Sequence, residues 1–314
     1  MNDKPFVLAV CGATASGKTW LGVELAKKYN GEVVSADSMQ IYKGLNIASA
    51  KPTAEEMQGI PHHLIDFLER DSVFSVADYV ELANKKIHEI LERGKLPIIV
   101  GGTGLYIDSL LDNVKFSEAG SDNDFRESLY EFARINGNHA LYEKLVNADP
   151  VSAESIHENN LVRVIRALEV MHITGRKFSE LKAESRLEKS PYDSIIIGLN
   201  TADRSMLYDR INRRVDEMVE NGLIDEAREL YTSGFMATAS NAIGYKELIP
   251  YFENIMSLDD CIDKIKQETR HYAKRQLTWF RKNERIRWII IDDFSKKYEI
   301  LEKCEKAIAN YKIM

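Results

Sequence analysis

The chain has 314 residues, enough for one large domain or two smaller ones, and 44% of them are apolar, an ordinary share for a globular protein. No apolar run approaches the roughly 18 residues of a membrane-spanning helix, and the three cysteines lack the spacing of a zinc site. We therefore expect reduced thiols in a cytoplasmic protein. The formal net charge of −7 argues weakly against a nucleic-acid partner, although the distribution of charge matters more than its sum.

The first motif joins a strand to a helix. An apolar run over residues 6–10 precedes the glycine-rich stretch, and an apolar-periodic segment over residues 20–29 follows it. The stretch consists of Gly12, Ala13, Thr14, Ala15, Ser16, Gly17, Lys18 and Thr19. This is the spacing of a P-loop, in which backbone N–H groups at a helix N-terminus enclose phosphate. Lys18 would bring a charge to the phosphates and Thr19 a hydroxyl ligand for Mg²⁺, so we predict a diphosphate or triphosphate site.

A second short strand is predicted over residues 31–37, and it ends in Asp37. The carboxyl ends of strands in an open α/β sheet face the ligand crevice, which would place Asp37 beside the phosphates. Position alone fits a capping role equally well, because aspartate also favours such turns. For His62 and His63 we predict a structural role, since adjacent side chains of a strand point in opposite directions. Ser75 is predicted to cap a helix over residues 76–93.

A third buried strand over residues 96–100 runs into a second glycine turn. This turn contains Gly101, Gly102, Thr103 and Gly104 and leads into another helix. The glycines fit close packing of a helix on a strand, whereas a hydroxyl at the strand end favours a ligand contact by Thr103.

The segment from 116 to 189 changes character, because strand-like runs disappear and polar, helix-periodic sequence takes over. It includes an amphipathic helix over residues 160–170 with a glycine stop at Gly175. Strand-like runs return at 194–199 and 288–292. The predicted fold class is α/β, with a P-loop NTPase-like parallel sheet flanked by helices. Residues 1–115 and 190–314 would form the core, and residues 116–189 a helical insertion domain.

Two later segments are basic. The predicted helix over 203–222 places Arg210 and Arg214 on one face, either as a solvated surface or as cations for a phosphate. Residues 264–287 contain nine Lys and Arg residues and two acids, a local charge of +7, with aromatic residues between them. Such a run is either a solvated helix face or a contact surface for RNA.

Taken together, the motifs resemble those of the tRNA dimethylallyltransferase (tRNA isopentenyltransferase) family. The matching stretches are T-A-S-G-K-T, S-A-D-S-M-Q, P-H-H-L-I-D, G-G-T-G-L-Y, V-R-V-I-R-A-L-E-V, A-I-G-Y-K-E and K-R-Q-L-T-W-F-R. They occur in the family's order and span residues 6–288. The resemblance implies transfer of a dimethylallyl group from its diphosphate to N6 of the adenosine 3′ of the anticodon, in tRNAs that read codons starting with U. The absence of the zinc finger of eukaryotic members indicates a bacterial form.

The resemblance also implies roles for individual residues. Asp37 matches the general base, Thr103 the hydroxyl that contacts the target nucleotide, and Lys18, Thr19 and Arg214 the groups that hold the diphosphate. Mg²⁺ would be the cofactor, with Thr19 and Asp37 as its ligands. The expected partners are the tRNA anticodon stem-loop and dimethylallyl diphosphate, and we expect a monomer. The implied tRNA contacts are Asp37, Ser38, Met39, Gln40, Thr103, Arg126, Arg163, Val164, Ile165, Arg166, Ala167, Ala242, Ile243, Gly244, Tyr245, Lys246, Glu247, Lys274, Arg275, Gln276, Leu277, Thr278, Trp279, Phe280 and Arg281.

The chain departs from the family pattern at Ala13, at Trp20, at residues 46–49 and at residues 159–160. None of these departures removes a group assigned to the chemistry. The main alternative is a P-loop kinase of a small metabolite or nucleotide, although no strand ends in a clear Walker-B acid unless Asp37 serves. A GTPase would need the acid that the stretch beginning at Asn84 lacks, and an RNA-binding switch protein would leave Asp37 and Thr103 without a role.

Overall fold

The computed structural model describes residues 4–116, 120–185, 187–234, 242–291 and 293–309. The chain divides into two compact units, one formed by Met1–Leu111 with Pro191–Met314 and the other by Asp112–Ser190. The sequence places the corresponding boundaries at 115/116 and 189/190, within four residues of this division.

The first unit contains a six-stranded sheet in which all described pairs are parallel, in the order β3-β2-β4-β1-β5-β6. The strands are β1 (Phe6–Gly12), β2 (Gly31–Ala36), β3 (His62–His63), β4 (Leu96–Gly101), β5 (Asp193–Thr201) and β6 (Ile286–Ile291). The predicted α/β fold class with a parallel sheet is therefore confirmed. Each long strand is apolar because both faces of a parallel sheet are covered.

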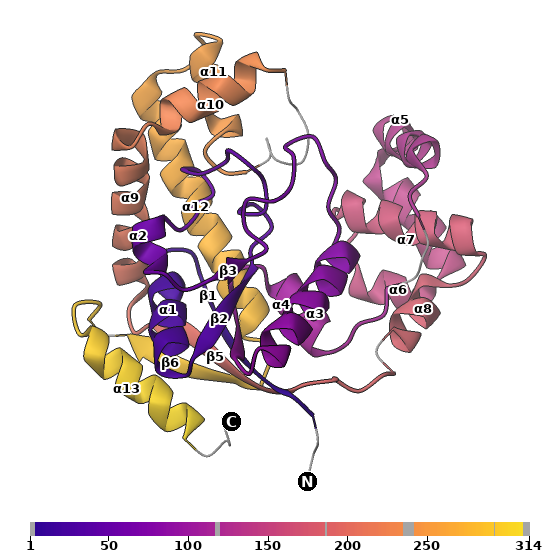
Figure 1. Cartoon of the computed structure of the whole chain (residues 1–314). Coiled ribbons are helices and arrows are strands. Elements are labelled where there is room, and N and C mark those ends of the chain that lie inside the picture. Colours follow the sequence, from indigo (N-terminus) through magenta and orange to yellow (C-terminus); the bar gives the residue numbers. More distant parts are fainter. Residues whose placement is uncertain (1–3, 117–119, 186, 235–241, 292, 310–314) are drawn as a thin grey trace. The chain divides into compact units, whose positions relative to one another are not determined.

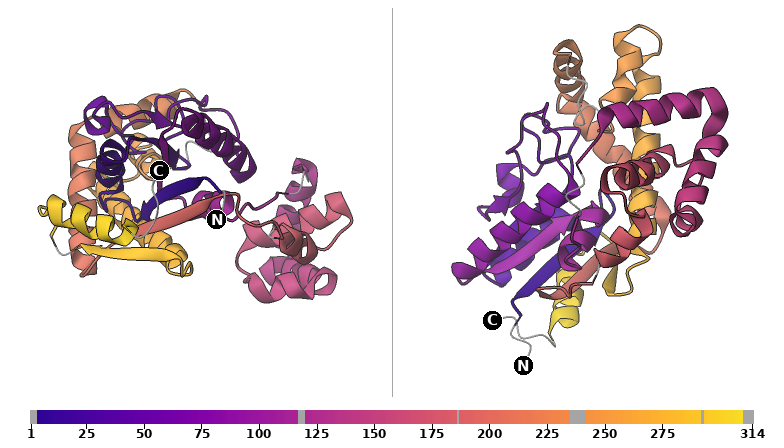
Figure 2. Two further views of the ribbon diagram at one scale, coloured as in Figure 1. Left: turned by 60° about the horizontal axis from the view of Figure 1, so that its bottom comes forward. Right: turned by 90° about the vertical axis from the view of Figure 1, so that its right-hand side faces the viewer.

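Alternate residues of β1 supply the two faces of the sheet. Val7 and Ala9 belong to the core beneath α3 (Val76–Glu92) and α4 (Gly104–Leu111). Leu8 and Val10 belong to the opposite core, beneath α1 (Lys18–Lys28) and α13 (Lys297–Ile308). Figure 1 shows these helices around the sheet, and Figure 2 shows α13 (yellow) close to α1 (indigo). The sheet thus lies between two helical layers.

Local sequence signals account for several helix ends. The Ser75 hydroxyl accepts a hydrogen bond from Asp78 N–H and the Asp78 carboxylate accepts one from Ser75 N–H, which is the capping box that starts α3. Gly175 ends α7 (Leu161–Thr174) in the left-handed conformation, as predicted. The two histidines of β3 have structural contacts, since His63 lies 2.7 Å from buried Glu32 and His62 2.8 Å from the Ile60 carbonyl.

A third apolar cluster lies beyond the carboxyl ends of the strands. It joins α9 (Arg204–Glu220), α10 (Leu223–Thr232), η2 (Lys246–Leu248) and α12 (Leu258–Phe280) to the loop that contains Ile41 and Leu45. Two four-residue helices, α2 (Ala54–Met57) and α11 (Ile249–Phe252), complete this unit.

The helices of the second unit are separated by loops, and no strand occurs among its described residues (Figure 2). It contains α5 (Asn123–Ala148), α6 (Pro150–Ser155), α7 and α8 (Phe178–Glu184), with a break in α5 at Gly137, whose φ is +87°. Buried Leu141, Leu145 and Ile165 belong to its separate apolar core. The prediction of helices in this segment is confirmed.

Candidate active site

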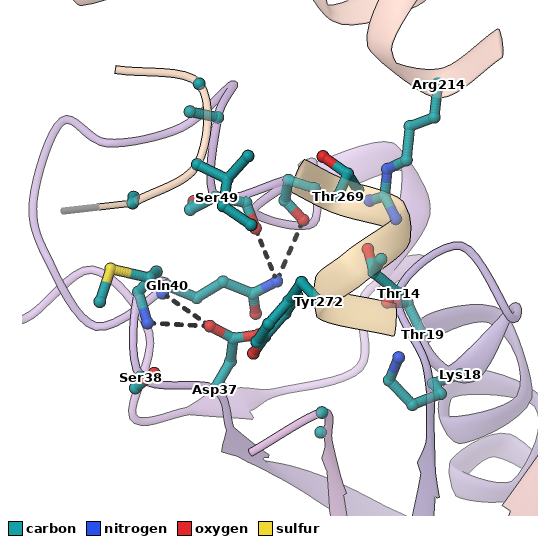
Figure 3. A pocket seen from close by; sticks show the side chains of 18 of the residues that line it. Thr14, Lys18, Thr19, Asp37, Ser38, Gln40, Ser49, Arg214, Thr269 and Tyr272 are labelled. Carbon is teal, nitrogen blue, oxygen red and sulfur yellow. Dashed lines mark hydrogen bonds between the residues drawn. The ribbon is translucent and has the colours of Figure 1, made fainter. Parts of the chain in front are cut away.

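The candidate site is a cavity of about 310 Å³ at the carboxyl ends of β2 and β4, beside the glycine-rich loop. The loop, the Asp37 turn, α9 and α12 all contribute to its wall (Figure 3). The polar side chains of the predicted site that line it are Thr14, Lys18, Thr19, Asp37, Ser38, Gln40, Arg214, Lys246, Arg275 and Gln276. Residues far apart in sequence therefore meet where the open-sheet rule places ligands.

The loop after β1 has the geometry expected of a P-loop. Gly17 adopts the left-handed conformation, with φ +88°, immediately before α1. A Cβ at Gly12 would lie 2.7 Å from the Leu199 carbonyl oxygen, so only glycine fits at that position. Helix α1 begins at Lys18, two residues earlier than predicted, which places Lys18 and Thr19 in its first turn. The backbone N–H groups of this turn are available to an anion.

Lys18 lines the cavity close to a second cation, Arg214. Its Nζ donates a hydrogen bond of 2.6 Å to the Ala13 carbonyl. Burial and, to a smaller extent, nearby Arg214 lower the pKa of Lys18 to about 8, against the opposing effect of Asp37. Burial also lowers the pKa of Arg214. Two desolvated cations beside each other are costly unless an anion binds between them.

Asp37 follows β2 directly and shapes its own turn. Its Oδ1 accepts hydrogen bonds from Met39 N–H at 2.8 Å and from Gln40 N–H at 3.3 Å, as Figure 3 shows. The capping interpretation is thus correct for a loop turn rather than for a helix. Because the carboxylate also lines the cavity, capping and a catalytic role are compatible.

Thr103 is held next to that turn. Its Oγ1 accepts a hydrogen bond of 3.1 Å from Ser38 N–H, while its own N–H donates to the Ala36 carbonyl, also at 3.1 Å. A Cβ at Gly101 would lie 2.1 Å from that same carbonyl oxygen. The glycine turn therefore permits close packing of β4 against β2 and holds the Thr103 hydroxyl beside the Asp37 turn. Thr103 is not among the described residues that line the cavity, and its contact with a ligand remains a prediction.

Arg210 and Arg214 share a face of α9, as predicted, but their side chains have different contacts. Arg214 lines the cavity. Arg210 donates from Nε to the Ala15 carbonyl at 2.9 Å, and its guanidinium lies 3.7 Å from the centre of the Phe294 ring. Since Ala15 has a φ of +60°, this bond supports a strained loop residue. Arg210 thus holds the P-loop, and Arg214 is the arginine placed for a ligand.

The structure divides the implied tRNA contacts into exposed and buried side chains. The exposed ones on the basic part of α12 and after it are Lys274, Arg275, Thr278 and Arg281, and others are Arg163 and Lys246. Partly buried ones are Asp37, Ser38, Met39, Gln40, Thr103, Arg126, Arg166, Ile243 and Trp279. Buried ones are Val164, Ile165, Ala167, Ala242, Gly244, Tyr245, Glu247, Gln276, Leu277 and Phe280. Three of the buried residues, Ala242, Gly244 and Gln276, nevertheless line the cavity. The assignment of all these segments to tRNA contact remains a prediction.

Several of the remaining candidates are also engaged with the protein. The Trp279 indole N–H donates to Asp108 at 2.7 Å, and Gln40 Nε2 donates to the Ala50 carbonyl at 3.0 Å. Arg126 and Arg166 both form ion pairs of 2.7 Å with Glu169, whose side chain is completely buried. These two guanidinium groups are thus held in place by one carboxylate.

Two residues that the sequence analysis did not single out are important here. Glu226 on α10 accepts hydrogen bonds from the N–H groups of Asn46 at 2.8 Å and Ala48 at 3.1 Å, and from the Tyr245 hydroxyl at 2.7 Å. Tyr272 on α12 lines the cavity, and burial raises the pKa of its hydroxyl. No local pattern marks Glu226, whereas Tyr272 could have been found by its spacing of four residues from Gln276 on one helix face.

The cavity offers oxygen donors that suit Mg²⁺. The Thr19 hydroxyl and the Asp37 carboxylate both line it. Among the described residues no group of three or more His, Cys, Asp or Glu side chains forms a metal site. A magnesium ion held by few protein ligands, with phosphate and water completing the octahedron, fits this composition.

Comparison with known proteins agrees with these observations. The family described as IPP transferase matches residues 40–283. The tRNA dimethylallyltransferase of Thermoanaerobacter sp. (strain X514) is 50% identical over 300 residues, 95% of each chain, and that of Halalkalibacterium halodurans is 48% identical over 303 residues, 96% of each.

Solved structures of similar proteins also match this chain over nearly its whole length. The full-length tRNA isopentenylpyrophosphate transferase from Bacillus halodurans is 46% identical, with a TM-score of 0.72 over 98% of this chain and 96% of that one. A eukaryotic dimethylallyltransferase acting on tRNA is 31% identical, with a TM-score of 0.83 over 98% of this chain and 79% of the other. By sequence and by fold, this chain belongs to the IPP transferase family, that of the tRNA dimethylallyltransferases.

Proposed function

We propose that this protein transfers the dimethylallyl group of dimethylallyl diphosphate to N6 of the adenosine 3′ of the anticodon, in tRNAs that read codons starting with U. The N6–C1 bond forms as the C1–O bond to diphosphate breaks, and N6 gives up one proton. The observation that carries the proposal is the meeting of a phosphate-binding loop with Asp37 in one cavity, because the reaction needs an anion site and a base.

Asp37 is the group that accepts the N6 proton in this proposal. An exocyclic adenine amine is a weak nucleophile, so proton removal has to accompany attack on C1. The two turn hydrogen bonds to Oδ1 orient the carboxylate. Thr103, held by Ser38, is placed to contact the nucleotide beside it. The target base is inaccessible in a stacked loop and must be extruded to reach the cavity.

Lys18, Thr19 and Arg214 bind the diphosphate and meet the charge that develops as it leaves. Burial lowers the pKa values of Lys18 and Arg214, and the charge of Arg214 also lowers that of Lys18; a bound anion would favour the charged forms. Thr19 and Asp37 would hold Mg²⁺, which supplies further neutralisation of the leaving diphosphate when bound.

The tRNA surface that we propose is formed by the exposed cations at the end of α12. Lys274 and Arg275 are adjacent and exposed, and Arg281 follows at the end of the helix. Clustered cations and aromatic residues suit phosphate contacts and base stacking.

Among the described residues no helix combines the length and apolar character needed to cross a membrane. We further propose that the protein is a cytoplasmic monomer.

A donor exchange tests the proposal. The purified protein is incubated with unmodified tRNA, Mg²⁺ and either dimethylallyl diphosphate or ATP. The tRNA is then digested, and its modified nucleosides are identified by mass spectrometry. We expect a prenylated adenosine only with the prenyl donor. Consumption of ATP with unmodified tRNA would instead support the kinase, and Asp37 would become a metal ligand.

A further inference from the structure

Gln276 has an unusual position for a residue in a basic helix. It lies on α12 between exposed Arg275 and buried Leu277, and its own side chain is only 6% exposed. Oε1 accepts a hydrogen bond from Thr14 N–H at 2.8 Å, and Nε2 donates one to the Gly102 carbonyl at 2.9 Å. One partner is a donor and the other an acceptor, so they determine the orientation of the amide.

The two backbone partners belong to the loops that carry the chemistry. Thr14 is in the P-loop after β1, and Gly102 precedes Thr103 in the glycine turn after β4. Strands β1 and β4 are neighbours, and their described register ends with Cys11 opposite Gly101. Beyond that pair, the Gln276 amide links the two segments through the Thr14 N–H and the Gly102 carbonyl.

The fit around this amide is close. A Cβ at Gly102 would lie 2.2 Å from Gln276 Nε2, so a side chain at 102 would displace the amide from this position. On the same helix, Tyr272 lies one turn earlier and lines the cavity, and the guanidinium of Arg275 lies 5.7 Å from the centre of its ring. A displacement of α12 therefore acts directly on both loops.

We propose that Gln276 is a positioning residue that couples the tRNA-facing helix α12 to the diphosphate loop. Its amide keeps the P-loop and the Thr103 turn at a common spacing, and tRNA that binds Lys274 and Arg275 changes the affinity for the prenyl diphosphate through this bridge. The coupling has to be reciprocal, because each ligand alters the affinity for the other by the same factor. This inference rests on the proposed function for the identity of the two ligands.

The test compares Gln276→Met with a matched control, Gln267→Met, which changes an exposed glutamine on the same helix. The dissociation constant of inorganic diphosphate is measured with and without a saturating anticodon stem-loop, in the presence of Mg²⁺. For the unaltered protein and the control we expect the stem-loop to change diphosphate affinity by at least about fivefold, the lower end of ordinary coupling between sites. For Gln276→Met we expect a factor near one, with stem-loop affinity unchanged within about twofold.

If Gln276 has only a structural role, Gln276→Met should weaken the binding of both ligands or lower the thermal stability, and the coupling between the ligands should remain. Retained coupling in Gln276→Met, or no coupling in the unaltered protein, would overturn the proposal. If Gln276→Met does not fold, Gln276→Asn replaces it, because the amide is kept but is one methylene too short to reach both partners, and the same loss of coupling is expected. A failure of the proposed function can be told apart from a failure of this inference. In the first case even the unaltered protein would produce no prenylated adenosine in tRNA.

Discussion

Ser38 and Thr103 are joined by a hydrogen bond of 3.1 Å from the Ser38 N–H to Thr103 Oγ1. The bond links the turn that follows β2 to the turn that follows β4, one strand away in the sheet. As a result, the hydroxyl assigned to the nucleotide is held beside the turn whose residues Asp37 and Ser38 line the cavity.

Replacement of Asp37 by asparagine should separate its two roles. The amide oxygen can still accept from Met39 and Gln40, so the turn should survive, but the general base is lost. We expect the single-turnover rate to fall by about 10²- to 10⁴-fold with tRNA affinity nearly unchanged. The control is Asp203→Asn, which alters an exposed N-cap aspartate of α9 and should keep full activity. An unchanged chemical step in Asp37→Asn would rule Asp37 out as the base.

Glu226→Ala should destabilise the protein without touching the cavity's cations. The substitution removes the acceptor for three backbone N–H groups of residues 46–48 and for the buried Tyr245 hydroxyl. We expect the free energy of unfolding to fall by about 2 kcal/mol in urea titrations, the cost of leaving such groups unpaired. Glu229→Ala, on the same helix, removes only the exposed pair with Arg70 and should cost about 0.5 kcal/mol or less. Equal losses in both variants would contradict this account.

The pKa of Lys18, lowered to about 8, makes diphosphate binding depend on pH. Only protonated Lys18 attracts the anion, so affinity for inorganic diphosphate should fall by up to about tenfold for each pH unit above 8. The comparison is Lys18→Arg, whose guanidinium keeps its charge in this range and should remove that part of the pH dependence. Identical pH profiles would show that Lys18 does not bind the ligand.

The lowered pKa of Lys18 also makes the stability of the fold depend on pH, but stability should rise with pH where diphosphate affinity falls. Between pH 8 and the ordinary lysine value of 10.5 the unfolded chain holds a proton that the folded chain has lost. The free energy of unfolding contributed by this group therefore rises with pH over that interval. Urea titrations of the protein and of Lys18→Arg at pH 8 and pH 10 measure the difference. A contribution that falls as the pH rises would contradict the lowered pKa of Lys18.

Removal of the charges at Lys274 and Arg275 should weaken tRNA binding through phosphate contacts. For the double alanine variant we expect the slope of log Kd against log salt concentration to fall by about 1.5. The control is a double variant of Lys296 and Lys306, exposed lysines near and on α13, which should leave the slope unaltered. A slope that is the same in all three proteins would show that α12 does not contact phosphate.

Much of this protein is determined locally. The P-loop spacing, the buried strands and the Ser75 capping box each depend on a few consecutive residues, and the structure confirms them. Backbone conformation and burial respond to local pattern, so glycines and apolar periods suffice to recognise these elements. The convergence of Lys18 and Asp37 on one cavity also followed from sequence, because parallel strands place their carboxyl ends together.

The partners of individual side chains were decided only by the tertiary structure. The family motif grouped Gln276 with the basic residues around it, yet its side chain faces inward to Thr14 and Gly102, 262 and 174 positions away. Arg210 and Arg214 look equivalent on a helical wheel, but one holds a loop carbonyl and the other lines the cavity. Glu226 shows no local signal at all. These assignments depend on which distant backbone groups lack a partner once the sheet has formed, and a linear pattern does not contain that information.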